Sequence, residues 1–427
     1  MSVFIGYPSF MAYQMMKGKK GNNDGFPSIP GMIARYSALG LTNEEMSKNP
    51  VWVDKTGNGH DLQMKNFAWK EGSGISDIYP GALVFDGVDD YGVCDNFPIL
   101  TKEKGYTVVA LRSYLAESIG YLVYNGTNAK QSAFAFERSD SLDTWSWGIN
   151  SSIRNSLPKL MSYQTSNSYN NNIISTGTAI EGDKLIRIVS SGGYCNVAIW
   201  ELVFLDHDAT EEELTKIKDY FVKTYPWLFP DQAWTVTGKT NEDEDRATIA
   251  NITGNGNDLV LSNFGFAEGS GYNEQGEYAG YLVTDGVDDK IVSSVFIMGK
   301  DFTIVGDWKF IDNKKSGTGL VKGSSFYIYN TMTGLDLYIN SGSVKNSLDG
   351  IKSINAACSD GRAYDRNWNE ILANTGNVVG SGGTLEVSSS GGRFDRIAFK
   401  NLAIYPRILS KDECIKAYNY LQTLKAK

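Results

Sequence analysis

Gly57-Asn58-Gly59-His60-Asp61-Leu62 returns later in the chain as Gly254-Asn255-Gly256-Asn257-Asp258-Leu259. Further out, Asp86-Gly87-Val88-Asp89-Asp90 is matched by Asp285-Gly286-Val287-Asp288-Asp289, and Asn66-Phe67 by Asn263-Phe264. The matches keep their order at a spacing of about 190 to 200 residues, whereas solenoid repeats have periods of about 20 to 50 residues. The sequence therefore predicts two complete domains of the same fold.

Each copy is expected to close with a helix. Thr210-Glu211-Glu212-Glu213 and Ser410-Lys411-Asp412-Glu413 both have the capping-box pattern, in which the hydroxyl bonds the N3 amide and the glutamate returns to the N-cap amide. Apolar residues then recur on one helical face, namely Leu214, Ile217 and Phe221 in the first copy and Cys414, Ala417 and Leu421 in the second. A strand-like run precedes each cap, at residues 197–205 and 397–405.

The interior of each copy reads as short strands. Runs of β-branched and aromatic residues, such as Tyr106–Val109, Phe302–Val305 and Phe326–Tyr329, alternate with Gly/Asn turns. We therefore predict an all-β chain of two tandem antiparallel jelly-roll β-sandwiches, each ending in a short α-helix, preceded by an N-terminal arm. The domains are placed at residues 1–30 (arm), 31–229 and 230–427. The proline-stiffened segment Tyr225–Pro230 is expected to pack between the sandwiches.

Composition excludes several classes. The chain has 427 residues, 41% of them hydrophobic, and a formal net charge of -9. This hydrophobic content rules out wholesale disorder, and the acidic balance argues against nucleic acid or an anionic membrane as the main partner. No apolar run reaches the roughly 18 to 20 residues of a membrane span, so a soluble protein without membrane insertion is expected.

The first 30 residues are predicted to form an anchoring arm. Phe4, Tyr7, Phe10 and Tyr13 lie in a segment without a strand or helix period, so it could not bury these aromatics alone. The basic residues follow the apolar part and no small-residue cleavage site comes next, which is unlike an export signal. A first strand or a disordered leader is the alternative.

The cysteines predict free thiols. Cys94, Cys195, Cys358 and Cys414 have no cysteine counterparts in the other copy, whereas a disulfide framework would recur in both copies. We expect four free, mostly buried thiols and assembly in a reducing cytoplasm. The chain has no C-x-x-C, and its two histidines, His60 and His207, lie far apart. No zinc site and no cofactor are therefore predicted.

These residues resemble the concanavalin A-like lectin/glucanase superfamily, specifically its laminin-G-like jelly rolls. The first copy carries the pattern in Asp54, Gly57–Leu62 and Phe85–Tyr91. The second copy departs from it at Asn251, Thr284 and Lys290 but keeps Leu409–Glu413. The resemblance covers roughly residues 31 to 427. It implies a sandwich fold and leaves function open, because the superfamily includes lectins, hydrolases and structural modules.

No catalytic set is predicted. The related glucanases use a Glu-x-Asp-x-Glu strand that points carboxylates into one cleft, and this chain lacks it. The acidic runs Glu44-Glu45 and Glu242–Asp245 are interpreted as solvated loops. Neither His60 nor His207 has a nucleophile motif around it. The prediction is that the protein is not an enzyme.

The Asp-rich turns have two interpretations. Asp86, Asp89 and Asp90, with their counterparts Asp285, Asp288 and Asp289, supply hard oxygen ligands for calcium. The favoured alternative is a backbone turn in which the aspartates accept amide hydrogen bonds and Gly87 or Gly286 takes positive φ. No metal is predicted.

Sugar binding would need an exposed aromatic ring with polar groups around it. Tyr163, Tyr169, Tyr364 and Trp368 lie in polar stretches and are candidates. Because most tyrosines in a β protein fill half-buried strand positions, the sequence does not select binding residues among them.

The predicted function is that of a bacteriophage virion surface protein, a head fibre or a tail fibre, that displays lectin-like modules to glycans. The arm and the tandem modules resemble virion decoration proteins, which implies virion partners through the arm and a homotrimer or homodimer. Multivalent display would turn weak glycan affinity into avidity. The alternatives are a purely structural virion component, and a secreted bacterial glycan-binding protein or glycoside hydrolase.

Overall fold

The computed structural model describes most of the chain. The described residues are 24–116, 119–126, 133–138, 144–146, 149–151, 160–174, 181–190, 192–297, 299–311, 318–323, 326–330, 334–339, 347–349, 353–372, 382–390 and 393–426. Residues 1–23, and with them most of the predicted arm, lie outside this set.

The chain divides into two compact units, Met1–Thr224 and Tyr225–Lys427. We call them the first copy and the second copy. The boundary predicted from the sequence, after residue 229, lies a few residues later. The aromatic segment at the boundary belongs to the second copy, where it forms a 3-10 helix, η1 (Pro226–Leu228). Its packing between the sandwiches stays a prediction.

Among its described residues, the first copy has two eight-stranded sheets. The first sheet has the order β14-β13-β12-β7-β16-β5-β4, with β1 paired to β16. Its strands are β1 (Met32–Ser37), β4 (Gly74–Ser76), β5 (Ala82–Asp86), β7 (Thr107–Tyr114), β12 (Met161–Thr165), β13 (Ser168–Tyr169), β14 (Asn172–Ile173) and β16 (Asn196–Leu205). The second sheet has the order β11-β10-β9-β8-β15-β6-β3-β2. Its strands are β2 (Val51–Trp52), β3 (Leu62–Lys65), β6 (Tyr91–Cys94), β8 (Tyr121–Asn125), β9 (Phe134–Arg138), β10 (Thr144–Ser146), β11 (Ile149–Ser151) and β15 (Ile186–Ile188).

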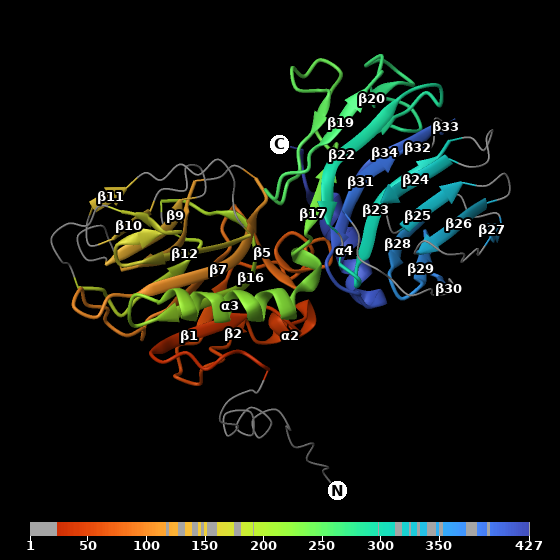
Figure 1. Ribbon diagram of the computed structural model, residues 1–427. Coiled ribbons are helices and arrows are strands. Elements are labelled where there is room, and N and C mark those ends of the chain that lie inside the picture. Colours follow the sequence, from red (N-terminus) through yellow and green to blue (C-terminus); the bar gives the residue numbers. More distant parts are fainter. Residues whose placement is uncertain are drawn as a thin grey trace, which may run out of the picture. The chain divides into compact units, whose positions relative to one another are not determined.

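The described part of the second copy also has two eight-stranded sheets. Figure 1 labels many of their strands. The first has the order β20-β21-β34-β23-β28-β29-β30, with β17 paired to β34. Its strands are β17 (Gln232–Thr235), β20 (Gly271–Asn273), β21 (Tyr281–Val283), β23 (Thr303–Phe310), β28 (Ile354–Cys358), β29 (Arg362–Asp365), β30 (Glu370–Leu372) and β34 (Ile397–Tyr405). The second has the order β18-β19-β22-β31-β24-β25-β26-β27. Its strands are β18 (Thr248–Ile249), β19 (Leu259–Ser262), β22 (Lys290–Ile297), β24 (Thr318–Gly323), β25 (Phe326–Asn330), β26 (Gly334–Ile339), β27 (Ser347–Asp349) and β31 (Gly382–Val387). A short ribbon, β32 (Ser389–Ser390) with β33 (Arg393–Phe394), completes this copy.

The two copies have the same strand order in both sheets. In the first sheets, β1, β4, β5, β7 and β16 occupy the places of β17, β20, β21, β23 and β34. The second sheets correspond in the same way, from β2 opposite β18 to β11 opposite β27. Eight strands can be arranged in a sheet in very many orders, and the two copies share the same order in both sheets. The fold therefore confirms the internal duplication.

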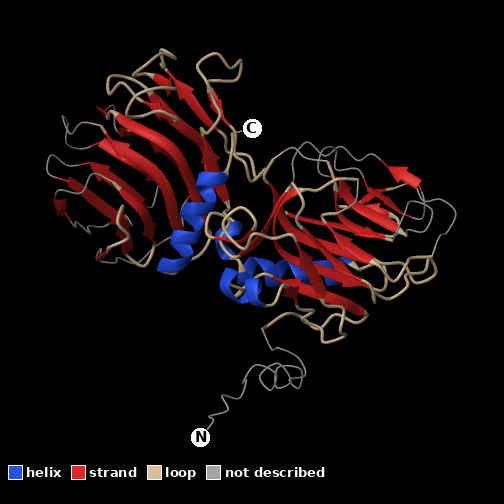
Figure 2. Ribbon diagram, turned by 180° about the vertical axis from the view of Figure 1, so that it is seen from behind, coloured by secondary structure: helices blue, strands red, loops and turns tan. Residues whose placement is uncertain are grey.

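The core of each copy lies between its two sheets, and strands dominate both copies (Figure 2). In the first copy, Phe85 and Val108 of the first sheet pack with Leu62 and Ile186 of the second. Apolar residues alternate with exposed ones along the half-buried strands, as in Leu62–Lys65 and Leu259–Ser262. The fold is therefore the predicted all-β antiparallel sandwich.

A helix follows the long central strand of each copy. Helix α3 (Glu211–Thr224) buries Ile217, Tyr220 and Phe221, and α4 (Lys411–Thr423) buries Cys414, Ala417, Tyr420 and Leu421. Both capping boxes are formed: Glu213 N–H donates to Thr210 Oγ1 (3.3 Å), and Glu413 N–H donates to Ser410 Oγ (3.3 Å). The two closing helices are thus confirmed.

One prediction about the acidic runs is wrong. Glu44 and Glu45 do not lie in a loop but in the first turn of a short helix, α2 (Asn43–Lys48), whose N-cap is Thr42. Thr42 and Glu45 have the T-x-x-E spacing of a capping box, and this signal predicts the helix start. The second run, at residues 242–245, does lie in turns before β18.

The four cysteines are free and buried, as predicted. Among the described residues, no helix combines the length and apolar character that crossing a membrane requires.

Candidate functional site

A pocket of about 260 Å³ opens at one end of the first sandwich, which we call the rim pocket. Four segments line it: residues 31–33 at the start of β1, the turn with Asn58 and His60, the connection from β6 to β7 at residues 98–105, and Asp206 after β16. Segments far apart in the sequence meet here because β1 and β16 are neighbours in the first sheet, and the two connections cross the same end.

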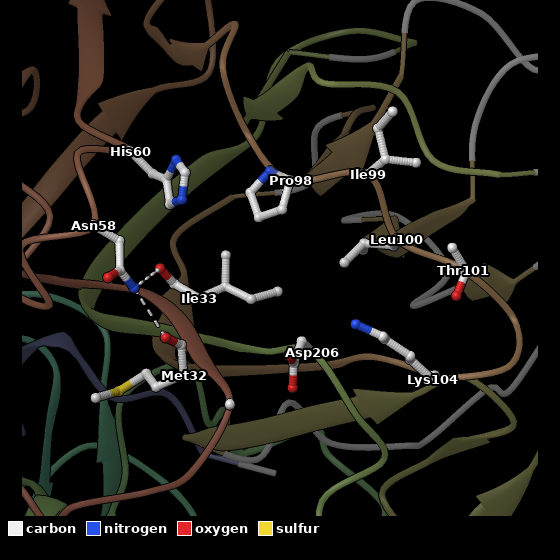
Figure 3. A pocket seen from close by; sticks show the side chains of 12 residues that line it. Met32, Ile33, Asn58, His60, Pro98, Ile99, Leu100, Thr101, Lys104 and Asp206 are labelled. Atoms are coloured by element: carbon white, nitrogen blue, oxygen red, sulfur yellow. Dashed lines mark hydrogen bonds between the residues drawn. The ribbon is translucent and has the colours of Figure 1, made fainter.

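The duplicated Gly-Asn-Gly turn shapes one wall of the rim pocket. Buried Asp54 accepts the amide hydrogens of Arg35 (3.1 Å), Thr56 (3.0 Å) and His60 (3.3 Å), which ties the turn to β1. Asn58 Nδ2 donates to the carbonyl oxygens of Met32 (3.1 Å) and Ile33 (2.9 Å), as the dashed lines in Figure 3 show. The turn residues recognised in the sequence therefore position His60 at the pocket.

The rim pocket combines polar groups of different kinds. The Nδ1 atom of His60 is buried and has no hydrogen-bond partner among the described residues. Lys104 is exposed and forms no ion pair within the described part of the chain, and its ammonium group points into the pocket (Figure 3). Asp206 accepts from His207 Nδ1 at 3.2 Å when that ring atom is protonated, and its side chain stays 47% exposed.

Apolar groups form the rest of the lining. The side chains of Ile33, Pro98, Ile99 and Leu100 surround the space between His60 and Lys104 in Figure 3. The pocket thus offers one cation, one carboxylate and one imidazole beside an aliphatic surface. This mixture suits a small ligand that has both hydroxyl groups and C–H surfaces.

The second copy differs at these positions. Asn257 stands where His60 stands, and Pro406 follows β34 where Asp206 follows β16. Lys300 has the same place as Lys104, three residues before the β23 threonine Thr303. The second copy therefore keeps the cation and loses both the carboxylate and the imidazole of the rim pocket.

The Asp-rich turns have the geometry of the favoured interpretation. In each motif the three carboxylates offer oxygens within 4.8 Å of one another. Asp86 Oδ1, however, accepts the amide of Val88 (2.8 Å), and Asp90 Oδ2 accepts the amide of Asp86 (3.0 Å). Asp285 and Asp289 accept the equivalent amides at 2.7 Å each, and Gly87 and Gly286 have φ of 77° and 74°. The aspartates thus stabilise a backbone turn.

The first copy contains a buried ion pair that sequence reasoning missed. Arg112 of β7 and Glu137 of β9 are both 0% exposed, and Arg112 Nη2 lies 2.6 Å from Glu137 Oε1. Tyr114 Oη (3.1 Å) and Tyr169 Oη (2.6 Å) donate to the same carboxylate. Burial raises the pKa of Glu137, but Arg112 and these hydrogen bonds outweigh it and hold the pKa below its usual value. The pair joins the two sheets inside the core.

The candidate sugar-stacking aromatics are placed differently from one another. Tyr169 and Tyr364 are 1% and 0% exposed, so neither can stack on a ligand. Tyr163 is half-buried on β12. Trp368 is half-buried at the tip of the β29–β30 hairpin, where its ring contacts Tyr418. Polarity of the surrounding stretch did not decide exposure, because alternate residues of a strand point to opposite faces.

Comparison with known proteins gives distant structural similarities. No family model and no curated protein sequence matches the chain. A Trypanosoma rangeli sialidase mutant with trans-sialidase activity is 12% identical, with a TM-score of 0.34 over 62% of this chain and 49% of that one. The binding domain of botulinum neurotoxin DC in complex with SialylT is 9% identical, with a TM-score of 0.35 over 87% and 99%. Domain 4 of a GH43 extracellular arabinanase from Geobacillus stearothermophilus, in complex with arabinotriose, is 12% identical, with a TM-score of 0.31 over 44% and 98%.

These comparisons correct one prediction. The prediction that the protein is not an enzyme is contradicted, because sialidases and an arabinanase are among the matched structures. The chain spans about half the length of three of the matched sialidases, which it covers to 48 or 49%. At these TM-scores the similarity assigns neither a reaction nor a ligand, so the proposal below rests on the residues of the site.

Proposed function

We propose that the protein is a glycan-binding protein of a virion surface, and that the rim pocket of the first copy holds one sugar ring. The observation that carries this proposal is the lining of the pocket, in which Lys104, Asp206 and His60 surround an aliphatic surface. A sugar ring presents hydroxyl groups that donate and accept hydrogen bonds, together with apolar C–H faces. A volume of about 260 Å³ lies just below the range of pockets for drug-sized ligands, which suits a single ring.

The geometry gives each polar residue a role. Asp206 would accept hydrogen bonds from two neighbouring hydroxyl groups, and Lys104 would donate to a hydroxyl or ring oxygen. The imidazole ring of His60, which lines the pocket, would contact the ring of the sugar. A single ring bound at one open pocket gives weak affinity, and several copies of the chain on one particle would raise it by avidity.

Alanine substitutions of the two charged residues test the pocket. Loss of one charge-assisted hydrogen bond costs about 1.5 to 3 kcal/mol, so Lys104→Ala and Asp206→Ala are each expected to raise the Kd about tenfold or more. Binding is measured by isothermal titration with the strongest ligand from an array of bacterial polysaccharides and monosaccharides. Lys300→Ala, at the equivalent position of the second copy, is the matched control and should leave the Kd unchanged.

The same array also tests the alternative that the protein is a purely structural component of the particle and contacts only other proteins. If no saccharide gives a signal with the wild-type chain, glycan binding is wrong. If a saccharide binds and Lys104→Ala and Asp206→Ala leave its Kd unaltered, the rim pocket is the wrong site. Release of reducing sugar from the bound polysaccharide is measured in the same samples and reports any hydrolysis.

The proposed virion role rests on the N-terminal arm and on the contacts that join the end of the arm to the first sandwich. Asp24 Oδ2 lies 2.8 Å from Arg35 Nη1, and the Phe26 ring lies 4.8 Å from the Tyr220 ring of α3. Arg35 also pairs with buried Glu201 at 3.0 Å. The second copy has Ala233 and Asn401 where Arg35 and Glu201 stand, so these contacts are specific to the first copy, where the arm joins the sandwich.

Deletion of residues 1–23 is expected to abolish incorporation of the protein into particles while the sandwich stays folded. Asp24 and Phe26 remain in this truncated chain, and their contacts with Arg35 and Tyr220 hold the start of β1. Incorporation is measured by co-sedimentation with assembled particles, and folding by the melting temperature. A truncated protein that still sediments with particles would refute the anchoring role.

A further inference from the structure

The outer face of the first sheet of the second copy carries two lysines around one tyrosine. Lys309 Nζ lies 4.6 Å from the centroid of the Tyr281 ring, and Lys400 Nζ lies 6.0 Å from it. All three side chains are half-buried. Within the described residues, neither lysine forms an ion pair with a carboxylate. Both ammonium groups thus lie within 6.0 Å of the centroid of one ring, on a chain whose net charge is -9.

A polar network fixes this tyrosine. Asp307, which is 5% exposed, accepts a hydrogen bond from Tyr281 Oη at 2.9 Å. Arg366 Nη2 lies 3.1 Å from the other oxygen of Asp307. The charge of Asp307 is thus matched by Arg366, and Lys309 and Lys400 leave an excess of two positive charges. A rigid, positively charged surface results.

Trp368 lies beyond Arg366 in the same hairpin and is held in an unusual conformation. Its φ is 62°, a left-handed value that is rare for a bulky residue. Asp365 Oδ1 accepts the amides of Asn367 and Asn369 at 2.8 Å each, which forces the tight turn. The ring meets that of Tyr418 at 5.6 Å and stays half-exposed. Such local strain is commonly kept where the side chain has a function.

Within the first copy itself, a buried tryptophan occupies the equivalent outer face of the first sheet. The register of the strands places Ala198 between Val84 and Ser113, and Ala398 between Val283 and Lys309. By this register Trp200 stands where Lys400 stands. Trp200 is 0% exposed, and its Nε1 donates to Pro80 O at 2.9 Å. The lysines and the open face are therefore specific to the second copy.

We propose that this surface, formed by Tyr281, Lys309, Lys400, Arg366 and Trp368, binds a saccharide that carries carboxylate groups. The Trp368 ring stacks on the C–H face of one sugar unit, and the two lysines neutralise the carboxylate of a neighbouring unit. The proposal takes the saccharide class from the proposed function and is independent of the rim pocket, which lies in the other copy. It gives the two copies different ligand preferences.

The test uses the full-length chain and oligomers of galacturonic acid, with neutral galactose oligomers and inorganic phosphate as comparison ligands. The acidic oligomer is expected to bind, and its Kd to rise severalfold between 50 and 500 mM NaCl because salt screens the lysines. Lys309→Ala with Lys400→Ala, and separately Trp368→Ala, should each weaken binding about tenfold or more. Trp368→Phe keeps a stacking ring and should stay within about threefold of the wild type.

The control is Lys416→Ala, because Lys416 Nζ also lies over an aromatic ring of this copy, that of Trp227, at 4.4 Å. It should leave the Kd unchanged. Unaltered binding in the double lysine variant overturns the proposal, and so does equal binding of phosphate and the uronate oligomer. Lys104→Ala with Asp206→Ala should retain uronate binding. If that variant alone loses it, the surface is wrong while glycan binding stands, and if no saccharide binds at all, both proposals fall.

Discussion

Replacing Glu137 by alanine is expected to destabilise the first sandwich by about 3 to 5 kcal/mol, because it leaves the charge of Arg112 buried without a partner. Both side chains are 0% exposed, and the carboxylate accepts from Arg112 and from two tyrosines. Urea unfolding of the full chain measures the loss. Hydrogen exchange of the β7 and β9 amides at each urea concentration assigns the transition to this copy.

The control is Arg112→Met combined with Glu137→Leu, which replaces the pair by apolar side chains of similar volume. It should lose less stability than Glu137→Ala because no charge is left buried, and its remaining loss of about 1 to 3 kcal/mol comes from the Tyr114 and Tyr169 hydroxyls, which lose their acceptor. The second copy supports this expectation, since buried Trp308 occupies the position of Arg112. A loss below about 1 kcal/mol in Glu137→Ala would mean that water reaches Arg112.

The sequence predicted the parts of the fold that depend on local pattern. The repeated Gly-Asn-Gly turn, the Asp-Gly-Val-Asp-Asp turn and the two capping boxes each need only neighbouring residues, and all of them form as predicted. The duplication predicted the domain organisation, because two similar sequences with their motifs in the same order are expected to adopt the same fold. The identical strand orders of the two copies follow from it.

The candidate sites could not be predicted in the same way. Arg112 stands in a β-branched and apolar run, and its partner Glu137 belongs to the opposite sheet, so their meeting depends on strand register. Tyr364 is buried because it lies on β29, whereas Trp368 is half-buried because it lies in the turn between β29 and β30, and the polarity of the stretch does not distinguish the two positions. Four segments line the rim pocket, and only the turn at Asn58 belongs to a motif that was recognised in the sequence. The Gly-Asn-Gly motif predicts the turn itself but not which other segments lie beside it.

The stability contributed by Asp90 and Asp289 is expected to fall as the pH rises from about 4 to about 6, because each is a buried aspartate with a raised pKa. Burial, the largest effect, raises the pKa of Asp90 and of Asp289 to about 6, although serine and backbone hydrogen bonds oppose it. Their side chains are 0% and 1% exposed. The native state therefore holds these protons more tightly than the unfolded chain, so ionisation costs up to about 2 to 3 kcal/mol per site.

Asp90→Asn and Asp289→Asn isolate this effect. Asparagine cannot ionise, yet its Oδ1 can still accept the amide of Asp86 or Asp285, so each variant should be more stable than the wild type at pH 7.5 and about equal to it at pH 4.5.

Other groups also titrate: the pKa of Glu137 is lowered and that of His207 is raised. Their contributions cancel in the difference between variant and wild type. Urea unfolding at six pH values measures the two curves, with exposed Asp77→Asn as the control that should run parallel to the wild type. If the Asp90→Asn curve also runs parallel to the wild-type curve, the buried carboxyl groups do not titrate near pH 6. Water would then have to reach Asp90, although its side chain is buried in the structure.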